Sequence, residues 1–459
     1  MGRAFFAAFL LFPGLAALFL LLQLNGKLLP RTAKTGRSIV FGRNSRTKQL
    51  RIHDAKNGGA AGGHNTLKRV NSVVPLPVVS ATLAAPACYN IVMPDTRLDL
   101  DLEPVSQWLP ARWKKILIAG PCGAESEDQL LETARGIAAL GHASLFRAGV
   151  WKPRTRPGAF EGMGEAALEW LNVVKAETGL PVTVEVATAA HTELALKAGI
   201  DVLWIGARTT VNPFSVQEIA DALAGTDVPV LVKNPVNPDL MLWFGALERL
   251  NRAGIRKLGA IHRGFSTGTK TQYRNAPLWE MAIALRSACP ALPLICDPSH
   301  ISGRRDLIEP VSQQALDLDV DGLMIETHRD PATALSDAAQ QLTPALLQQL
   351  LQKLVVRDKG CNDANFGHQL NSLRTVIDDI DAEMVQALAR RMQVVEKIGS
   401  YKKEHGVTIL QIERWLHILQ SRTAQGEALG LDKDIIAELC QLLHKASIRR
   451  QTEVMNKAE

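Results

Sequence analysis

Eight short apolar runs, separated by amphipathic stretches of helical period, constrain this sequence more than any other feature. The runs are too short for helices and suit strands buried on both faces of a parallel sheet. Eight strand–helix units within about 240 residues predict an α/β protein of the (β/α)8, or TIM, barrel class, with residues 93–115 as an additional N-terminal element. The predicted strands are Ile116–Ala119, Ser144–Arg147, Val182–Val186, Val202–Ile205, Val230–Val232, Leu258–Ile261, Leu294–Cys296 and Gly322–Ile325.

The first 92 residues differ from the rest of the chain in composition. They hold twelve Lys/Arg and a single acid, Asp54. The apolar segment 4–24 is long enough to cross a bilayer as a helix, and the basic residues after it would place the following chain in the cytoplasm. The glycine-rich stretch 58–63 and the absence of any helix or strand period favour the alternative, a non-native or disordered extension with Met93 as the true start. On either interpretation we expect the folded part to be cytoplasmic.

From residue 93 onward the chain is mildly acidic, with 40 Lys/Arg against 45 Asp/Glu. This balance shows no basic surface for nucleic acid, so we predict no nucleic-acid partner. The six cysteines are scattered without a CxxC pair. That spacing favours a reducing compartment and no disulfide framework.

Charged side chains cluster at the predicted strand ends, where a barrel of this class places its active site. One group is cationic, and so many cations at one face would repel one another unless anions bind there. Guanidinium and ammonium groups suit phosphate and carboxylate, so we expect substrates that carry more than one phosphate. The cationic group comprises Arg147, Lys152, Arg154, Arg208, Lys233 and Arg263.

The second group at the strand ends consists of a thiol, an imidazole and two carboxylates. A single cysteine such as Cys122, in Gly-Pro-Cys-Gly, is usually a small buried apolar side chain. Its convergence with the three other donors favours a divalent metal site that accepts Mn, Fe, Co or Zn. The expected ligands are Cys122, His300, Glu326 and Asp337.

The motifs around these residues resemble those of the 3-deoxy-D-arabino-heptulosonate 7-phosphate (DAHP) synthases, in the branch shared with the 3-deoxy-D-manno-octulosonate 8-phosphate synthases. The resemblance covers about residues 95–350 and rests on AGPCGAES, FRAGVWKPRT, IGARTTVN, VLVKNP, CDPSHISG and GLMIETHRDP. It implies condensation of phosphoenolpyruvate with erythrose 4-phosphate, the first step toward chorismate. The KPRT version of the sugar-phosphate loop favours the four-carbon sugar over the octulosonate alternative.

The resemblance also implies roles for individual residues. Lys152 would be the general acid, and Glu185 could position the attacking water. The sugar phosphate would be bound at Arg154 and Thr155. The residues implied to contact phosphoenolpyruvate are Arg147, Lys152, Ala207, Arg208, Lys233 and Arg263.

After an expected barrel domain 93–350 and a linker 351–365, residues 366–459 regain a helical period. Apolar residues at intervals of three and four predict one helix of about 35 residues from Leu370 to near His405. Two shorter helices, Ile412–Glu427 and Lys433–Asn456, are expected to follow. Three helices form a small core, so we expect a homo-oligomer, a dimer or tetramer interlocked through these helices.

This all-α region resembles the all-helical chorismate mutases, in which one arginine reaches the partner's site in an interlocked dimer. In such an enzyme the arginines bind the two carboxylates of chorismate, while Lys402 and Gln451 stabilise the ether oxygen as its bond breaks. Trp415 departs from the family, since many members have there a glutamate that holds the substrate hydroxyl. The residues implied are Arg374, Arg391, Lys402, Gln411, Arg414, Ser447 and Gln451.

Three interpretations of the helical region stay open. The first is a second enzyme, a mutase that converts chorismate to prephenate and is fused to the synthase. In the second, the region only binds chorismate or prephenate and regulates the barrel, as the tryptophan at the glutamate position would suggest. In the third, it is only a dimerisation bundle.

Overall fold

The computed structural model describes residues 97–152, 158–268, 270–360 and 363–457, together with a short antiparallel pair, β1 (Ile39–Val40) and β2 (Arg51–Ile52). The expectations for the apolar segment 4–24 and for a start at Met93 lie outside the described residues. Among the residues described, no helix combines the length and apolar character that a membrane span requires.

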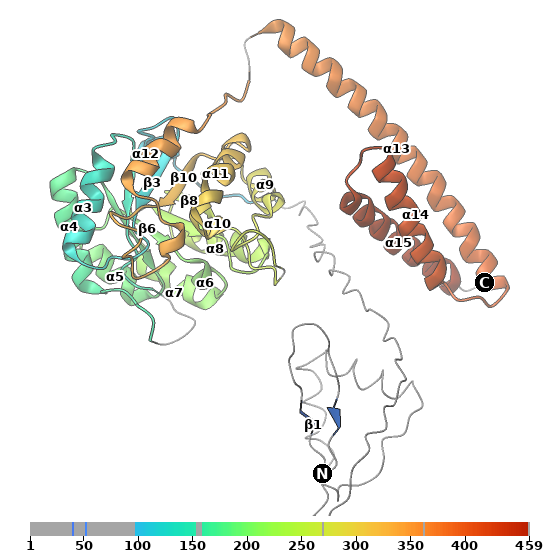
Figure 1. Cartoon of the computed structure of the whole chain (residues 1–459), viewed down its shortest axis with the longest axis horizontal. Coiled ribbons are helices and arrows are strands. Elements are labelled where there is room, and N and C mark those ends of the chain that lie inside the picture. The colour runs from blue at the N-terminus through green and yellow to red at the C-terminus, as the bar shows by residue number, and fades with distance from the viewer. Residues whose placement is uncertain are drawn as a thin grey trace, which may run out of the picture. The chain divides into compact units, whose positions relative to one another are not determined.

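Eight parallel strands close into a barrel in the order β10-β3-β4-β5-β6-β7-β8-β9, which confirms the predicted class (Figure 1). Three strands have the predicted bounds, and the other five differ by one residue at one end. The strands are β3 (Ile116–Gly120), β4 (Leu145–Arg147), β5 (Val182–Val186), β6 (Val202–Ile205), β7 (Val230–Lys233), β8 (Leu258–His262), β9 (Leu294–Cys296) and β10 (Gly322–Glu326).

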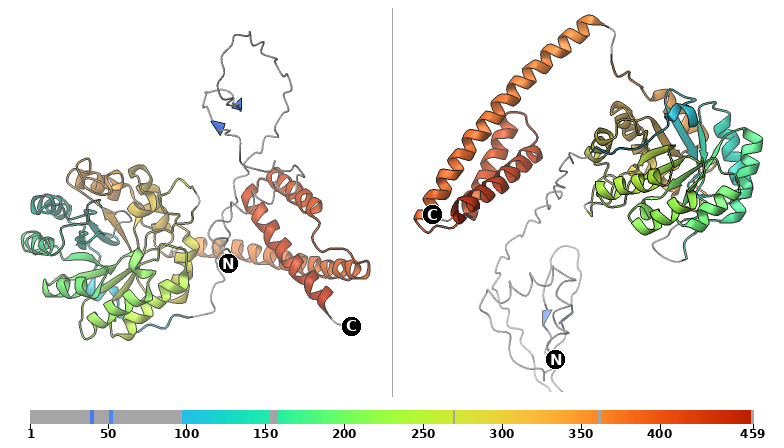
Figure 2. Two further views of the ribbon diagram at one scale, coloured as in Figure 1. Left: turned by 90° about the horizontal axis from the view of Figure 1, so that it is seen from below. Right: turned by 180° about the vertical axis from the view of Figure 1, so that it is seen from behind.

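Helices surround the barrel on its outer side (Figure 2). Several begin where a polar side chain accepts a hydrogen bond from the first turn, as Ser126, Asn212 and Thr343 do. The helices are α3 (Glu127–Ala138), α4 (Glu165–Thr178), α5 (Ala189–Lys197), α6 (Ala207–Thr210), α7 (Pro213–Leu223), α8 (Leu240–Arg252), α9 (Trp279–Ala288), α10 (Pro298–Ser302), α11 (Ile308–Asp317) and α12 (Pro344–Lys353), with 3-10 turns η1 (Arg305–Leu307) and η2 (Ala338–Gln340).

The barrel domain has two apolar clusters, one between strands and helices and one inside the barrel. The short helix α2 (Val105–Trp108) and the buried Leu109 pack against the inner cluster, which includes Ile116 at the start of β3. The predicted N-terminal element therefore covers the end of the barrel where the strands begin. The opposite end, where they finish, remains available for a site.

His262, the last residue of β8, is fully buried among aromatic rings rather than lining a site. Its ring centroid lies 5.1 Å from that of Trp279 and 5.7 Å from that of Phe265. Burial lowers the pKa of His262 to about 4, below the ordinary value of 6.5.

This burial predicts a loss of stability in acid. As the pH falls from 6.5 to about 4, His262 becomes protonated in the unfolded chain but stays neutral in the folded chain. The free energy of unfolding should fall by up to about 1.4 kcal/mol per pH unit over this window. Urea unfolding of wild type and of His262→Phe between pH 7 and pH 4 measures the difference. The exposed His368→Phe is the control, and equal pH dependence in the wild type and His262→Phe would contradict the prediction.

The C-terminal region is a three-helix unit of α13 (Ala364–Glu404), α14 (Ile412–Ala428) and α15 (Lys433–Asn456) (Figure 2). The third helix has the predicted bounds. The first begins six residues earlier than Leu370, because Asp363 caps it by accepting from the Asn365 backbone N–H. Gly399 allows α13 and α15 to approach closely, since a Cβ there would lie 3.3 Å from the Cα of Gln451.

Candidate active sites

A cavity of about 300 Å³ opens where the barrel strands end. It brings together eight of the residues predicted for the barrel site. The lining residues are Lys152, Glu185, Ala207, Arg208, Lys233, Val236, Arg263, Ser266, Arg274, Asn275, His300 and Asp337. Sequence reasoning missed Arg274 and Asn275, because they lie in the long segment between β8 and α9 rather than at a strand end.

Two of the predicted cations, Arg147 and Lys233, are buried and paired with carboxylates. Arg147 Nη2 lies 3.2 Å from Glu326 Oε1, and Lys233 Nζ lies 3.0 Å from Asp297 Oδ2. Each pair comes from strands or loops that meet only when the barrel closes. Burying a charge without such a partner would cost several kcal/mol.

Two further cations, Arg208 and Arg263, line the cavity and form no ion pair with any described residue. Burial lowers the pKa of Arg263 to about 10, and the nearby Arg274 and Arg208 act in the same direction against the opposing Asp297. The guanidinium stays charged at neutral pH in an environment that favours an anion. The cavity is therefore suited to phosphate and carboxylate groups.

The predicted sugar-phosphate residues Arg154 and Thr155 lie outside the described residues. Their role stays a prediction. The preceding Lys152 is described, and its ammonium group donates to the Cys122 carbonyl oxygen at 2.7 Å and to the Cys122 Sγ at 2.8 Å.

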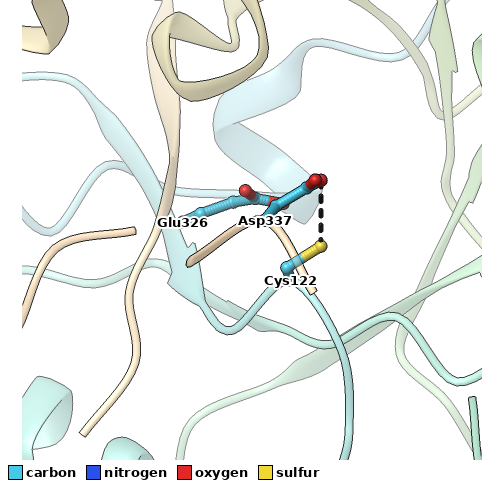
Figure 3. A group of neighbouring side chains, drawn as sticks. All are labelled: Cys122, Glu326 and Asp337. Carbon is cyan, nitrogen blue, oxygen red and sulfur yellow. Dashed lines mark hydrogen bonds between the residues drawn. The ribbon is translucent and has the colours of Figure 1, made fainter. Parts of the chain in front are cut away.

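The predicted metal ligands meet beside this cavity. Donor atoms of Cys122, Glu326 and Asp337 all lie within 4.8 Å of one another (Figure 3). The Cys122 thiol donates to Asp337 Oδ2 at 3.4 Å. His300 borders the group, with Nε2 3.7 Å from Glu326 Oε1. One thiol, two carboxylates and one imidazole form a donor set that suits a transition-metal ion.

The electrostatics of the group also fit a cation. Burial, with Glu326 nearby, raises the pKa of the Cys122 thiol to about 12, so without a cation it stays protonated. Although burial opposes it, Arg274, His300 and Lys152 hold the pKa of Asp337 well below its usual range. His300 Nδ1 lies 2.8 Å from Asp297 Oδ2, which leaves Nε2 directed toward Glu326 and the group.

Two buried glutamines, unpredicted from the sequence, contact two of the predicted ligands. Gln340 donates to Glu326 Oε2 at 2.7 Å and accepts from Arg274 at 2.7 Å. Gln341 accepts from the Cys122 backbone N–H at 2.9 Å and donates to the Ser336 carbonyl oxygen at 2.8 Å. The two glutamines thus connect the segment around η2 to Glu326 at the end of β10 and to Cys122 after β3. A pair of glutamines three and four residues after Asp337 was the available signal.

A second group of predicted residues meets between α13 and α15. Arg391 Nη1 donates to Ser447 Oγ at 2.8 Å, and Lys402 Nζ donates to the Ile409 carbonyl oxygen at 2.6 Å. The buried Gln451 Oε1 has no hydrogen-bond partner among the described residues. A cavity of about 420 Å³, lined in part by Arg391 and Trp415, opens beside this group.

Three predicted residues form no hydrogen bond with this group among the described residues. Arg374 is exposed on the first half of α13 and donates a hydrogen bond to Asn371 Oδ1 of the same helix at 3.4 Å. Gln411 is exposed at the N-cap of α14, and Arg414 faces His417 at 3.5 Å. Trp415 stacks on His444, with ring centroids 4.0 Å apart.

Comparison with known proteins gives two family matches. Residues 112–359 match the DAHP synthetase I family, and residues 373–452 match chorismate mutase type II. The chain is similar to a phospho-2-dehydro-3-deoxyheptonate aldolase of Thermotoga maritima, at 32% identity over 239 residues, 52% of this chain and 68% of that protein.

Similarity extends to a second group of enzymes and to solved structures. A 2-dehydro-3-deoxyphosphooctonate aldolase of Polaromonas naphthalenivorans is 29% identical over 270 residues, 53% of this chain and 90% of that protein. A crystal structure of the Thermotoga maritima DAHP synthase shares 30% identity, covers 52% of this chain and 67% of that chain, and has a TM-score of 0.48.

Proposed function

Because this chain belongs to the DAHP synthetase I family and carries a chorismate mutase type II domain, we infer that it is a bifunctional enzyme. Its barrel condenses phosphoenolpyruvate with erythrose 4-phosphate to DAHP, and its helical domain rearranges chorismate to prephenate. The observation that carries the first activity is the thiol, imidazole and carboxylate group beside an electropositive cavity. Two anionic substrates and one metal ion account for that combination.

We propose that Cys122, His300, Glu326 and Asp337 bind a divalent ion, with Mn, Fe, Co and Zn all compatible with the donors. When bound, such an ion supplies Lewis-acid polarisation of the aldehyde oxygen of erythrose 4-phosphate. Lys152, whose ammonium lies 2.8 Å from Cys122 Sγ, is close enough to deliver a proton to the same oxygen.

The remaining barrel residues bind and orient phosphoenolpyruvate. Arg208, Arg263 and Lys233 bind its phosphate and carboxylate, in a cavity that their charges make attractive to anions. Carbon 3 of phosphoenolpyruvate attacks the aldehyde carbon, whose oxygen takes a proton from Lys152. Water adds to carbon 2 and gives one proton to Glu185. The C–O bond between carbon 2 and the phosphate then breaks, the phosphate takes the bonding electron pair, and the remaining hydroxyl proton passes to the departing phosphate as the ketone forms.

The mutase reaction requires no acid or base, only a site that matches its transition state. Arg391 and Arg414 bind carboxylates of chorismate, and Lys402 and Gln451 donate to the ether oxygen as negative charge develops there. Gln451 is buried where α15 packs against Gly399 of α13, so its side-chain amide lies in the interior of the helical domain, as this role requires. Along the axis of α13, Arg374 lies about 25 Å from Arg391, at a rise of 1.5 Å per residue. It is therefore too far away to serve the same site in one chain.

A second copy of the chain supplies the missing arginine in our proposal. The first half of α13 exposes Leu373, Ile377, Ile380, Met384 and Leu388, which recur every three or four residues along one face. Helix α13 has 41 residues and α15 has 24. The apolar face of α13 is therefore longer than α14 and α15 of the same chain can cover. An interlocked homodimer, or a tetramer built from it, would bury this face and bring Arg374 of one copy to the site of the other.

Subunit complementation tests this arrangement. Arg374→Ala and Arg391→Ala should each abolish the mutase activity, whereas a dimer mixed from both variants contains one intact site. Random mixing should restore about a quarter of the wild-type rate, since about half the dimers are mixed and each has one of two sites. The control mixture, Arg391→Ala with Gln451→Ala, places one defect in each site and should restore nothing. Absence of recovery in the first mixture would contradict the shared site.

Assays of both reactions on one preparation of the full chain test the proposed function. With a divalent metal present, erythrose 4-phosphate should be consumed with phosphoenolpyruvate faster than arabinose 5-phosphate, and chorismate should be converted to prephenate. Preference for arabinose 5-phosphate would instead identify an octulosonate synthase. Trp415, which stacks on His444 and stands where many mutases have a glutamate that holds the substrate hydroxyl, favours one other candidate, a regulatory module. Binding of chorismate without turnover, together with altered condensation, would identify it.

A further inference from the structure

A single buried indole underlies three charged groups of the barrel site. Trp204 lies on β6, is fully buried and belongs to the cluster inside the barrel together with Leu231 and Ile295. It does not line the cavity. It nevertheless contacts residues from three other strands, Glu185 of β5, Arg147 of β4 and Lys233 of β7.

The contacts of Trp204 are of two kinds. Its Nε1–H donates to Glu185 Oε2 at 2.9 Å. Its ring lies beneath two cations, with the guanidinium carbon of Arg147 5.0 Å and Lys233 Nζ 5.7 Å from the ring centroid. Such cation–ring distances are attractive, more so where water is excluded.

Glu185 lies among cations, yet its hydrogen-bond donor is the uncharged indole N–H of Trp204. This carboxylate lines a cavity that also contains Lys152, Arg208 and Arg263. It nevertheless forms no ion pair with a described residue, and an indole N–H binds one of its oxygens instead. A cation bound to the carboxylate would stabilise its charged form and weaken it as a proton acceptor.

Gly206 defines the other side of the carboxylate. A Cβ at this position would lie 2.1 Å from Glu185 Oε1 and 2.7 Å from its carboxyl carbon. Only glycine therefore leaves room for Glu185 in its present position. Trp204 and Gly206, both from the segment that ends β6, together set where this carboxylate lies.

We propose that Trp204 is a positioning residue for condensation. Its N–H holds Glu185 in place without a countercharge, and its ring provides a separate contact for Arg147 and Lys233. The inference rests on the proposed function, in which Glu185 accepts a proton from the attacking water. Trp204 acts through Glu185 and has no contact of its own with the reacting atoms.

Two substitutions separate the hydrogen-bond donor from the bulk of the ring. Trp204→His keeps an N–H on a five-membered ring and loses the fused benzene ring, whereas Trp204→Phe keeps more volume and has no donor. Loss of the donor should lower kcat about 10- to 100-fold, so kcat should decrease in the order wild type, Trp204→His, Trp204→Phe. In Trp204→Phe the KM for phosphoenolpyruvate should change less than about threefold, because a six-membered ring remains beneath Arg147 and Lys233.

A purely structural role for Trp204 predicts the opposite order. Histidine leaves the larger cavity in the barrel interior and would then be the more damaging replacement. A kcat for Trp204→Phe equal to or above that of Trp204→His would therefore overturn the proposal. Whether the wild type condenses the two substrates at all is decided separately by its own rate, so the proposed function and the role of Trp204 fail in distinguishable ways.

A double-variant comparison tests the route through Glu185. In a Glu185→Gln background, Trp204→Phe should lower kcat less than about twofold. The side chain at position 185 is then neutral and no longer accepts the proton, so its positioning matters little. The matched control is Trp243→Phe, another fully buried indole, whose Nε1 donates to the Val232 carbonyl oxygen at 3.1 Å. Its effect should be the same in both backgrounds. Additive losses of kcat for the Trp204 and Glu185 substitutions would overturn the proposal. If Trp204→Phe does not fold, Trp204→His takes its place in the same comparison.

Discussion

Cys122→Ala is expected to lower the rate of condensation by at least about 10³-fold and to leave the mutase rate unchanged. Metal polarisation of a carbonyl contributes several kcal/mol to transition-state stabilisation, and each 1.4 kcal/mol is about tenfold in rate. Cys122 Sγ lies 3.4 Å from Asp337 Oδ2, so its removal takes one donor from a group of four. Metal content and both reaction rates, measured on the same preparation, test the prediction.

The matched control for Cys122 is Cys289→Ala. Cys289 is also buried, but it lies at the end of α9 and outside the ligand group. This variant should keep both its metal and its condensation rate. Treatment of the wild type with a chelator should reproduce the Cys122→Ala result and be reversed by added metal. Normal metal content and normal condensation in Cys122→Ala would show that the ion binds elsewhere or plays no part.

Lys402→Ala should lower the mutase rate about 10²- to 10³-fold, the usual effect of removing one preorganised donor from developing negative charge. Lys402 is partly buried and held by the Ile409 carbonyl oxygen at 2.6 Å, so its ammonium group is already ordered. Condensation should be unaffected, because the barrel residues are untouched. The two rates, measured at saturating substrate, provide the test.

Lys403→Ala is the control for Lys402. The neighbouring side chain is exposed and donates to the Lys457 carbonyl oxygen, away from Arg391 and Ser447. Its replacement should leave the mutase rate within about twofold, as is usual for an exposed side chain. Equal rates for wild type, Lys402→Ala and Lys403→Ala would remove the lysine from the mechanism. No mutase activity in the wild type would favour the regulatory interpretation.

The local pattern of the sequence predicts the elements well, for reasons that particular segments illustrate. The apolar run 182–186 is a strand because its β-branched residues suit a sheet buried on both faces, and β5 has those bounds. The third C-terminal helix was likewise predicted at both ends, from Lys433 to Asn456. Periodicity is a property of neighbouring residues, so it can be recognised without knowing the fold.

The proximity of Cys122 and Glu326 was also predictable, because barrel closure brings strand ends together. Cys122 follows β3 and Glu326 ends β10, and these strands are hydrogen-bonded neighbours although more than 200 residues separate them. Arg274 was not predictable, since it lies in an irregular segment between β8 and α9. Its position near Asp337 depends on long-range contacts, including a backbone hydrogen bond to Ser302.

The sequence by itself determined the alternation of strands and helices, the strand-end residues and the helical face of the C-terminal domain. Only the tertiary structure decided which residues support them: Gln340 and Gln341 behind Glu326 and Cys122, and Trp204 behind Glu185. Strand ends follow from local periodicity plus closure of the sheet. Side-chain hydrogen bonds across the barrel depend instead on distances of a few tenths of an ångström between distant segments, and no local pattern in the sequence carries that information.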